Sequence, residues 1–429
     1  GWYRCSMSSA TGSANFNYSI YVLDNFYTSG TPSAYTFTGD GVSGVYLWGA
    51  QLSDSASLDA YVPNNGAAPT AAAYYGPRLD YDPVTLAAKG LLVEEARTNL
   101  LIRSAAFDNA AWLLDAATVS ANATTAPDGT ATADKLVENT AVATHDIYQA
   151  IGTQPAGSFT YSVYIKPSGR TKIRLQQSLN TSYGVLFDLT ALTATTVVGG
   201  ATGIITDAGN GWYRCSMTYT TVASFTQALV VFLADASGAL SYTGDGTSGV
   251  FMWGAQLEAG SFATSYIPTG AATATRAADI ASVSTSQFPY GTAAGSFVVS
   301  YSLLGFSTSP VIASLNDGTG NNIIEHIGNT STQNIWRVRV GGANQCSDGS
   351  TTTASGTNKV GGAYSDNDFA STANGATVVP DTSGSIPTGI SQLTIGNRAA
   401  ASVMSGHIRQ ITYLPRKITN AELQTRTSA

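Results

Sequence analysis

Five polar or aromatic side chains on two consecutive predicted strands could form a saccharide-binding surface. Residues 159–165 alternate apolar and polar positions, which predicts a strand with one apolar face. After a turn signal at 167–170, residues 171–178 alternate again, with Ile173 and Leu175 directed inward. We expect the two strands to be neighbours whose outward side chains combine stacking with hydrogen bonding, as sugar sites do: Tyr164, Lys166, Lys172, Arg174 and Gln176. The alternative is an ordinary solvated face of an antiparallel sheet.

Three aspartates are candidate calcium ligands: Asp348, Asp366 and Asp368. Calcium prefers carboxylate oxygens, but no local run supplies the six or more oxygens that it takes. Aspartates in loops mostly accept hydrogen bonds from their own turn, so these three also fit turn formation. The three Cys and three His are too widely spaced for a zinc site. We therefore predict no bound metal and no cofactor.

Catalytic motifs find little support, and we predict that the protein is not an enzyme. The segments 39–44 and 244–249 both fit G-x-G-x-x-G, but each precedes a predicted strand and contains an Asp, which predicts a β-turn and not a dinucleotide site. No G-x-S-x-G elbow is present. His145, His326 and His407 have no obvious local partner, and the pairs Glu94/Glu95 and Asp80/Asp82 lie in a connector, where burial would not raise a carboxyl pKa.

Composition excludes further classes. The 429 residues include 20 Lys and Arg and 27 Asp and Glu, so the net charge is −7, and charged residues make up only 11%. Without a basic cluster we expect no nucleic-acid partner. The longest apolar run, near 228–234, has the length of a strand, so we expect no membrane insertion. Abundant Gly, Ser, Thr and Asn favour strands and turns over long helices.

An internal repeat shows the organisation. The heptapeptide GWYRCSM at 1–7 recurs at 211–217, and YTFTGDGVSGVYLWGAQL at 35–52 recurs as SYTGDGTSGVFMWGAQL at 241–257. The second copy has a long preceding region that the first lacks. We therefore expect the first copy to be the C-terminal part of a truncated domain, with further chain upstream. The Trp residues of both copies fit core packing better than a glycan platform.

The strand spacing predicts an all-β protein of tandem antiparallel sandwiches. The Asn-Gly pair at 210–211 predicts a hairpin, and Thr419 to Glu422 forms a capping box that opens one short helix. The predicted divisions are a truncated jelly-roll repeat at 1–70, a docked connector at 71–101, a complete jelly roll at 102–276 and a different β-sandwich at 277–429.

Several segments resemble tailed-bacteriophage virion proteins. They include GLLVEEARTNLL at 90–101, FDNAAW at 107–112, TAPDGTATADKL at 125–136 and the repeat itself. The resemblance implies jelly rolls similar to carbohydrate-binding modules. The segments AYSDNDFA at 363–370, LTIGN at 393–397 and GHIR at 406–409 resemble a concanavalin-like or laminin-G-like lectin domain.

This resemblance implies a fibre, spike or capsid-decoration protein on the external surface of a virion. Its expected partners are host-surface polysaccharide, other virion proteins and further copies of itself, with a homotrimer as the default for fibres. Two alternatives remain: a purely structural virion protein without glycan binding, and a polysaccharide depolymerase.

Overall fold

The computed structural model describes residues 77–429, except 178–182, 307–308, 331–332, 352–355, 399–401 and 429, together with a few isolated positions before 77. At 225–227, 329–330 and 348–351 it describes the backbone but not the side chains. The chain divides into two units, Gly1–Gly76 and Pro77–Ala429. The truncated repeat predicted at 1–70, with Trp2 and Trp48, lies outside the described residues.

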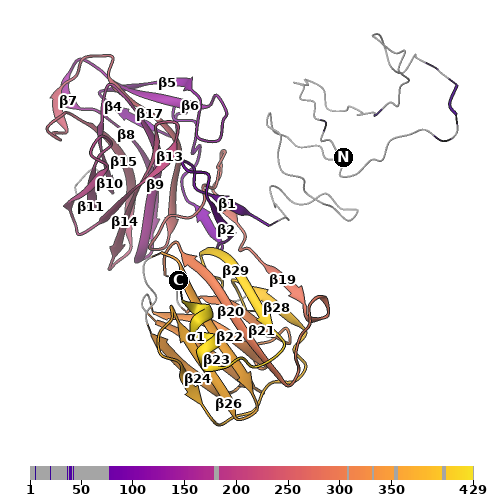
Figure 1. Ribbon diagram of the computed structural model, residues 1–429. Coiled ribbons are helices and arrows are strands. Elements are labelled where there is room, and N and C mark those ends of the chain that lie inside the picture. The colour runs from indigo at the N-terminus through magenta and orange to yellow at the C-terminus, as the bar shows by residue number, and fades with distance from the viewer. Residues whose placement is uncertain are drawn as a thin grey trace. The chain divides into compact units, whose positions relative to one another are not determined.

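Two six-stranded antiparallel sheets form a first sandwich (Figure 1). One, the β10 sheet, has the order β12 (Thr193–Val198), β11 (Tyr183–Asp188), β10 (Lys172–Gln177), β15 (Phe225–Ala234), β8 (Asp146–Gln154) and β4 (Leu113–Asp115). The other, the β9 sheet, has the order β13 (Thr202–Gly209), β14 (Trp212–Thr221), β9 (Gly157–Ser168), β17 (Gly249–Ala259), β6 (Ala133–Glu138) and β5 (Ala117–Thr124).

The core of the first sandwich follows the predicted alternation. Phe159 and the inward residues that follow it on β9 are at most 2% exposed, and Ile173 and Leu175 on β10 are fully buried. All belong to one apolar cluster between the two sheets. The hairpin predicted between β13 and β14 is confirmed, because Asn210 and Gly211 both have positive φ, at 54° and 78°. Such angles match the twist of a tight two-residue turn.

A second sandwich follows. Its β20 sheet has the order β1 (Leu79–Tyr81), β2 (Ala88–Val93), β29 (Gly406–Leu414), β20 (Ala294–Leu303), β25 (Asn358–Ser365), β26 (Asp368–Ala373) and β27 (Val379–Asp381). Its β22 sheet has the order β19 (Ala281–Ser284), β28 (Gln392–Ile395), β21 (Val311–Asn316), β22 (Ile323–Thr330), β23 (Gln333–Val340) and β24 (Ala343–Thr351). Trp336, Phe297 and Tyr301 anchor the core between them.

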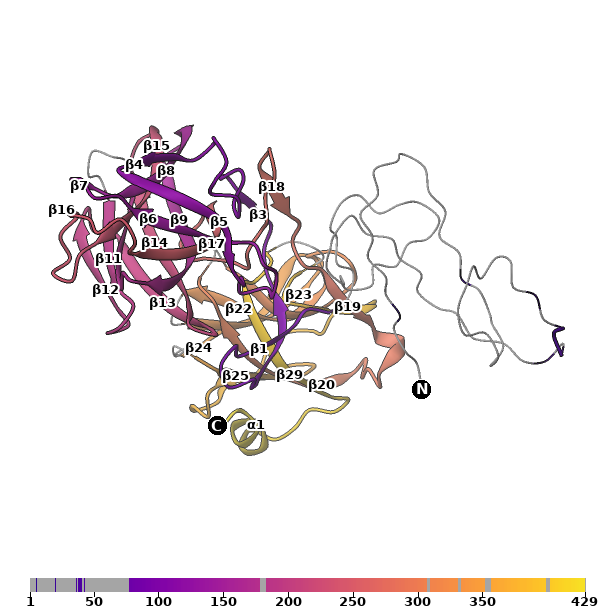
Figure 2. The same cartoon turned by 90° about the horizontal axis from the view of Figure 1, so that it is seen from above.

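The segment predicted as a connector contributes two strands to the second sandwich and one strand to a separate two-stranded sheet. β1 and β2 lie beside β29 in the β20 sheet (Figure 1). The next strand, β3 (Arg97–Asn99), pairs with β18 (Ala274–Arg276), and Figure 2 shows the two side by side. A further small ladder joins β7 (Val142–Thr144) to β16 (Ser241–Thr243).

Helix is scarce in the described residues, as the composition predicts. A 3-10 turn, η2 (Thr285–Gln287), follows β19. The predicted C-terminal helix is α1 (Asn420–Thr427), and the Thr419 hydroxyl accepts the Glu422 N–H at 3.2 Å. The Glu422 carboxylate binds Arg416 and Arg426. The all-β prediction, with one short helix at the end, is confirmed.

Candidate functional site

The five predicted saccharide-binding residues do not form one surface. Tyr164 and Lys166 lie on β9, whereas Lys172 and Arg174 lie on β10, in the opposite sheet of the sandwich. The expectation that consecutive strands would be neighbours is therefore wrong. The chain crosses between the sheets at the predicted turn, and β10 pairs with β11 and β15, which come later in the sequence.

On the β9 sheet, Tyr164 belongs to an aromatic group. Its ring lies 5.4 Å from the Trp253 ring in an edge-on arrangement, and the Arg214 guanidinium lies 5.3 Å from its ring centre. Lys166 is opposite Phe251 on β17. Trp253 and Trp212, from the second repeat copy, are 7% and 1% exposed, so they are anchors of a small apolar cluster. Both Trp side chains serve packing, as the sequence predicts.

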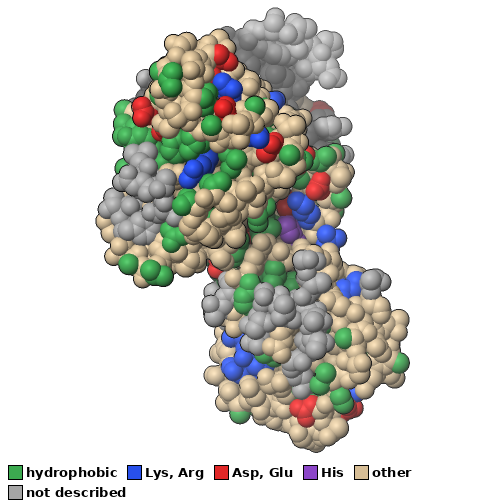
Figure 3. Space-filling view, turned by 90° about the vertical axis from the view of Figure 1, so that its left-hand side faces the viewer, with side chains coloured by type: hydrophobic (Ala, Val, Ile, Leu, Met, Phe, Trp, Pro, Cys, Tyr) green, Lys and Arg blue, Asp and Glu red, His purple; other side chains and the backbone are tan. Residues whose placement is uncertain are grey.

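The outer surface of the β10 sheet, which we call the β10 face, brings a polar and aromatic row together. The strand register places Arg174 directly opposite Phe232, Phe232 opposite Asp146, and Asp146 opposite Asp115. Adjacent strands lie ~4.8 Å apart, so the Arg174 and Asp146 backbones lie ~10 Å from each other, on either side of Phe232. Figure 3 looks onto this side of the first sandwich, where Lys and Arg side chains lie among hydrophobic ones.

The next rows extend this surface. Gln176 is opposite Val230, which is opposite the half-buried Tyr148. Lys172 forms an ion pair with Asp188 at 3.3 Å. Gln176 is only 1% exposed, so the expectation of a solvated outward side chain is wrong at this position. It lies in mid-sheet, where side chains from both neighbouring strands screen it.

Two charged groups on the β10 face are buried without full hydrogen bonding. Asp146 is 1% exposed, and its Oδ1 has no partner among the described residues. Burial, together with the charge of Asp115, raises the Asp146 pKa to about 6, although Thr144 and His145 oppose the shift. The Nε of Arg174 is likewise buried and unpaired, and burial lowers the pKa of this guanidinium. Unsatisfied buried polar atoms are costly, and these two lie beneath the half-buried side chains of the β10 face.

The raised pKa of Asp146 predicts a pH dependence of stability. Between pH 4 and 6 the folded chain holds a proton on Asp146 that the unfolded chain has released, so stability should fall as the pH rises through this window. The effect is on the order of 3 kcal/mol. Urea denaturation of Asp146→Asn at pH 4 and pH 6 should show this decline removed, and an unchanged decline would contradict the assignment.

Two of the three calcium candidates have partners within the protein. The Asp366 carboxylate accepts the Ile386 N–H at 3.2 Å, and the Asp368 carboxylate pairs with Lys417 at 2.9 Å. The Asp348 side chain lies outside the described residues. Within the described part of the chain, no group of three or more potential His, Cys, Asp or Glu ligands comes together.

The glycine-rich segment 244–249 is a turn that leads into β17. The Asp245 carboxylate accepts the N–H groups of Thr247 at 2.7 Å and Ser248 at 2.6 Å. A Cβ on Gly249 would lie 1.8 Å from the Leu136 carbonyl oxygen, so packing against β6 requires glycine there. The segment closes a strand connection and presents no helix N-terminus to a phosphate.

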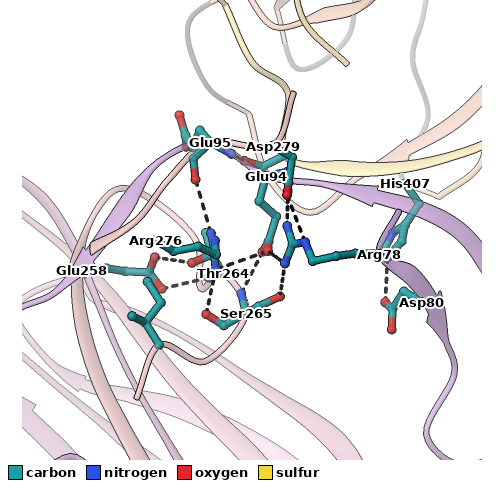
Figure 4. Close-up of polar contacts among 12 residues, drawn as sticks. Arg78, Asp80, Glu94, Glu95, Glu258, Thr264, Ser265, Arg276, Asp279 and His407 are labelled. Atoms are coloured by element: carbon teal, nitrogen blue, oxygen red, sulfur yellow. Dashed lines mark hydrogen bonds and ion pairs between the residues drawn. The ribbon is translucent and has the colours of Figure 1, made fainter. Parts of the chain in front are cut away.

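Glu94, considered above as one of an acid pair, lies in an ion network that joins the two sandwiches (Figure 4). It is fully buried and bonds Arg78 at 2.7 Å, Arg276 at 3.3 Å and the Ser265 N–H at 2.7 Å. Burial alone would raise the pKa of Glu94, but these three partners hold it below its usual value. The expectation of an exposed connector carboxylate is wrong for Glu94, and an ionised carboxylate of this kind is no general acid.

The other residues of chemical interest have structural partners. Asp80 accepts a hydrogen bond from His407 at 2.7 Å. The ring nitrogens of His145 contact the Ala116 and Tyr242 carbonyls. Cys215 and Cys346 are buried thiols. Among the described residues, no helix is long and apolar enough to cross a membrane.

One charged cluster was missed by the sequence analysis. Arg337, Arg339 and Arg398 surround the fully buried Glu325 on the outer surface of the β22 sheet. The alternation Trp-Arg-Val-Arg-Val at 336–340 signals two arginines on one strand face. The contribution of Arg398 could not be anticipated, because it comes from a distant segment.

No family model and no curated protein matches the chain. Among solved structures, it is similar to the CBM40 of Ruminococcus gnavus IT-sialidase bound to α2,3-sialyllactose, at 16% identity over 32% of this chain and 84% of that one, with a TM-score of 0.29. It is also similar to the LG4–5 domains of the mouse laminin α1 chain, at 11% identity over 62% and 90% of the two chains, with a TM-score of 0.22. A SAP-like pentraxin from Limulus polyphemus has 13% identity over 32% and 73%, with a TM-score of 0.25.

Proposed function

We propose that this protein is a non-catalytic saccharide-binding protein and that the β10 face is its binding surface. The observation that carries the proposal is that the half-buried Arg174 and Lys172 share the β10 face with the half-buried ring of Tyr148. Phe232, between Arg174 and Asp146, is only 5% exposed and supports this surface from below. Saccharide sites use this combination, since a ring stacks on the sugar face while a few placed polar groups bond its hydroxyls.

The proposal extends to attachment. The repeat and the segment GLLVEEARTNLL resemble virion proteins of tailed bacteriophages, so we propose a role on the external surface of a virion, contacting host polysaccharide. Several copies per particle, a homotrimer among them, would turn weak individual contacts into strong overall binding. A purely structural virion role is the competing proposal, and it predicts no saccharide binding at all. The depolymerase alternative predicts release of reducing ends from capsule.

The structure supplies a matched pair of variants to test the proposal. Lys172 lies on the β10 face and Lys166 on the β9 sheet. The full chain should first be screened on an array of bacterial polysaccharides. For the best binder, Lys172→Gln should weaken binding about threefold, as expected for one half-buried charged contact that is also paired with Asp188, while Lys166→Gln leaves it unchanged. Silence across the array, or equal effects of the two variants, would contradict the proposal.

A further inference from the structure

The outer surface of the β22 sheet carries an excess of positive charge. Trp336 and Val338 on β23 belong to the core, so Arg337 and Arg339, which alternate with them, point to the opposite surface. The register places Arg337 opposite Glu325 on β22. Three guanidinium groups, those of Arg337, Arg339 and Arg398, therefore lie near one carboxylate.

Glu325 is fully used by two of these arginines. Arg337 donates to its Oε1 from Nε at 3.0 Å and Nη2 at 2.5 Å. Arg398 donates from Nη2 to Oε1 at 2.7 Å and from Nε to Oε2 at 2.8 Å. Such paired contacts fix each guanidinium plane. Within the described part of the chain, the Nη1 groups of both arginines have no hydrogen-bond partner.

Arg339 has no carboxylate of its own within the described part of the chain. Its Nε donates to the neutral Asn344 Oδ1 at 2.7 Å. Burial and the charges of Arg337 and Arg398 lower the pKa of Arg339, and the charge of Glu325 only partly offsets them. In the adjoining loop, the Asp317 carboxylate already binds Thr319 and Asn322. The cluster is thus a preorganised cationic site with two uncompensated charges.

We propose that this arginine cluster binds the carboxylate or sulfate group of an acidic saccharide. Planar guanidinium groups with free N–H donors match the oxygens of such groups. The exposed Asn344 and Ser347, on the neighbouring strand, add neutral hydrogen-bonding groups for hydroxyls. A nucleic acid fits less well, because the chain as a whole carries −7 and a long polyanion needs extended phosphate contacts. This site is on a different sandwich from the β10 face, so an experiment can contradict one of the two binding proposals without contradicting the other.

The test uses the full chain and three polymers: dextran sulfate, polygalacturonate and neutral dextran. At low salt, dextran sulfate, polygalacturonate or both should bind far more strongly than dextran, and added salt should weaken that binding. Binding of one charged polymer alone supports the proposal and identifies the group bound. Absence of binding by both would overturn it.

The decisive variant is Arg339→Gln, which leaves both Glu325 ion pairs in place. It should reduce affinity for the charged polymer about tenfold, and Arg339→Lys should give a smaller loss, because it keeps charge without the planar fork. The control is Arg416→Gln, which removes the same charge at a side chain that is 58% exposed and should change affinity less than about twofold. Unchanged thermal unfolding keeps the comparison valid. Equal losses for Arg339→Gln and Arg416→Gln would overturn the proposal, whereas neutral-saccharide binding by the β10 face should not respond to Arg339→Gln.

Discussion

Replacing Glu94 by Gln should lower the free energy of unfolding by about 3–5 kcal/mol, because it removes the buried carboxylate that two half-buried arginines share. Glu94 is fully buried and is shared by Arg78 and Arg276, so a neutral amide cannot satisfy both. Arg78 also pairs with Asp279, which lies just before β19 (Figure 4). The measurement is a urea denaturation curve of the full chain, in which tryptophan fluorescence reports unfolding.

The matched control is Glu422→Gln on α1. Glu422 also pairs with two arginines, Arg416 and Arg426, but its side chain is 29% exposed. Solvent screens such a pair, so its loss should lower the free energy of unfolding much less than Glu94→Gln does. A similar cost for both variants would mean that the buried network adds nothing beyond a surface ion pair.

The same network gives a pH signature opposite in sign to that of Asp146. The folded-state pKa of Glu94 is lowered from 4.5, so its stabilisation is present above that pH and is lost as the pH falls through the lower folded value. Glu94→Gln should therefore remove part of the acid sensitivity of the wild-type chain.

Replacing Arg174 by Gln should reduce saccharide affinity at least about tenfold. A charge-assisted hydrogen bond contributes ~1.5–3 kcal/mol, which corresponds to tenfold or more in the dissociation constant. Arg174 is half-buried and cross-strand to Phe232, so its N–H groups are held in place before a ligand arrives. Titration calorimetry with the best-binding polysaccharide measures the change.

Arg214→Gln is the control of the same residue type. Arg214 lies on β14 in the β9 sheet, and its guanidinium lies over the Tyr164 ring of the same sheet. Its Nε is also buried and unpaired among the described residues. It should leave affinity unchanged. If Arg214→Gln weakens binding and Arg174→Gln does not, the binding surface is the β9 sheet and the proposed placement is wrong.

Local sequence patterns predict the strands and the face of the sheet on which each side chain lies. A period of two places Ile173 and Leu175 inward whatever the rest of the chain does, and the Asn210–Gly211 turn depends only on its own φ angles. Strand pairing is non-local. The partners of β10 lie later in the chain, and local alternation does not identify them. The sequence therefore predicts Tyr164 beside Arg174, whereas the two residues lie in opposite sheets.

Local patterns also do not predict the two ion networks, because the residues that form each network are far apart in the sequence. Glu94 is buried because Arg276 and Ser265 fold against it, and Ser265 is 171 residues away in the sequence. Glu325 gathers one arginine from the adjacent strand and another from after β28. A carboxylate in a charged stretch looks solvated in sequence, and only tertiary contacts show that it is buried and paired.

Hydrogen–deuterium exchange of the full chain, with and without the best-binding polysaccharide at saturation, tests the saccharide-binding proposal most directly. The account predicts added protection in peptides covering 146–150 and 172–177, with no change at 160–166. Protection confined to 160–166, or none within the first sandwich, would contradict it.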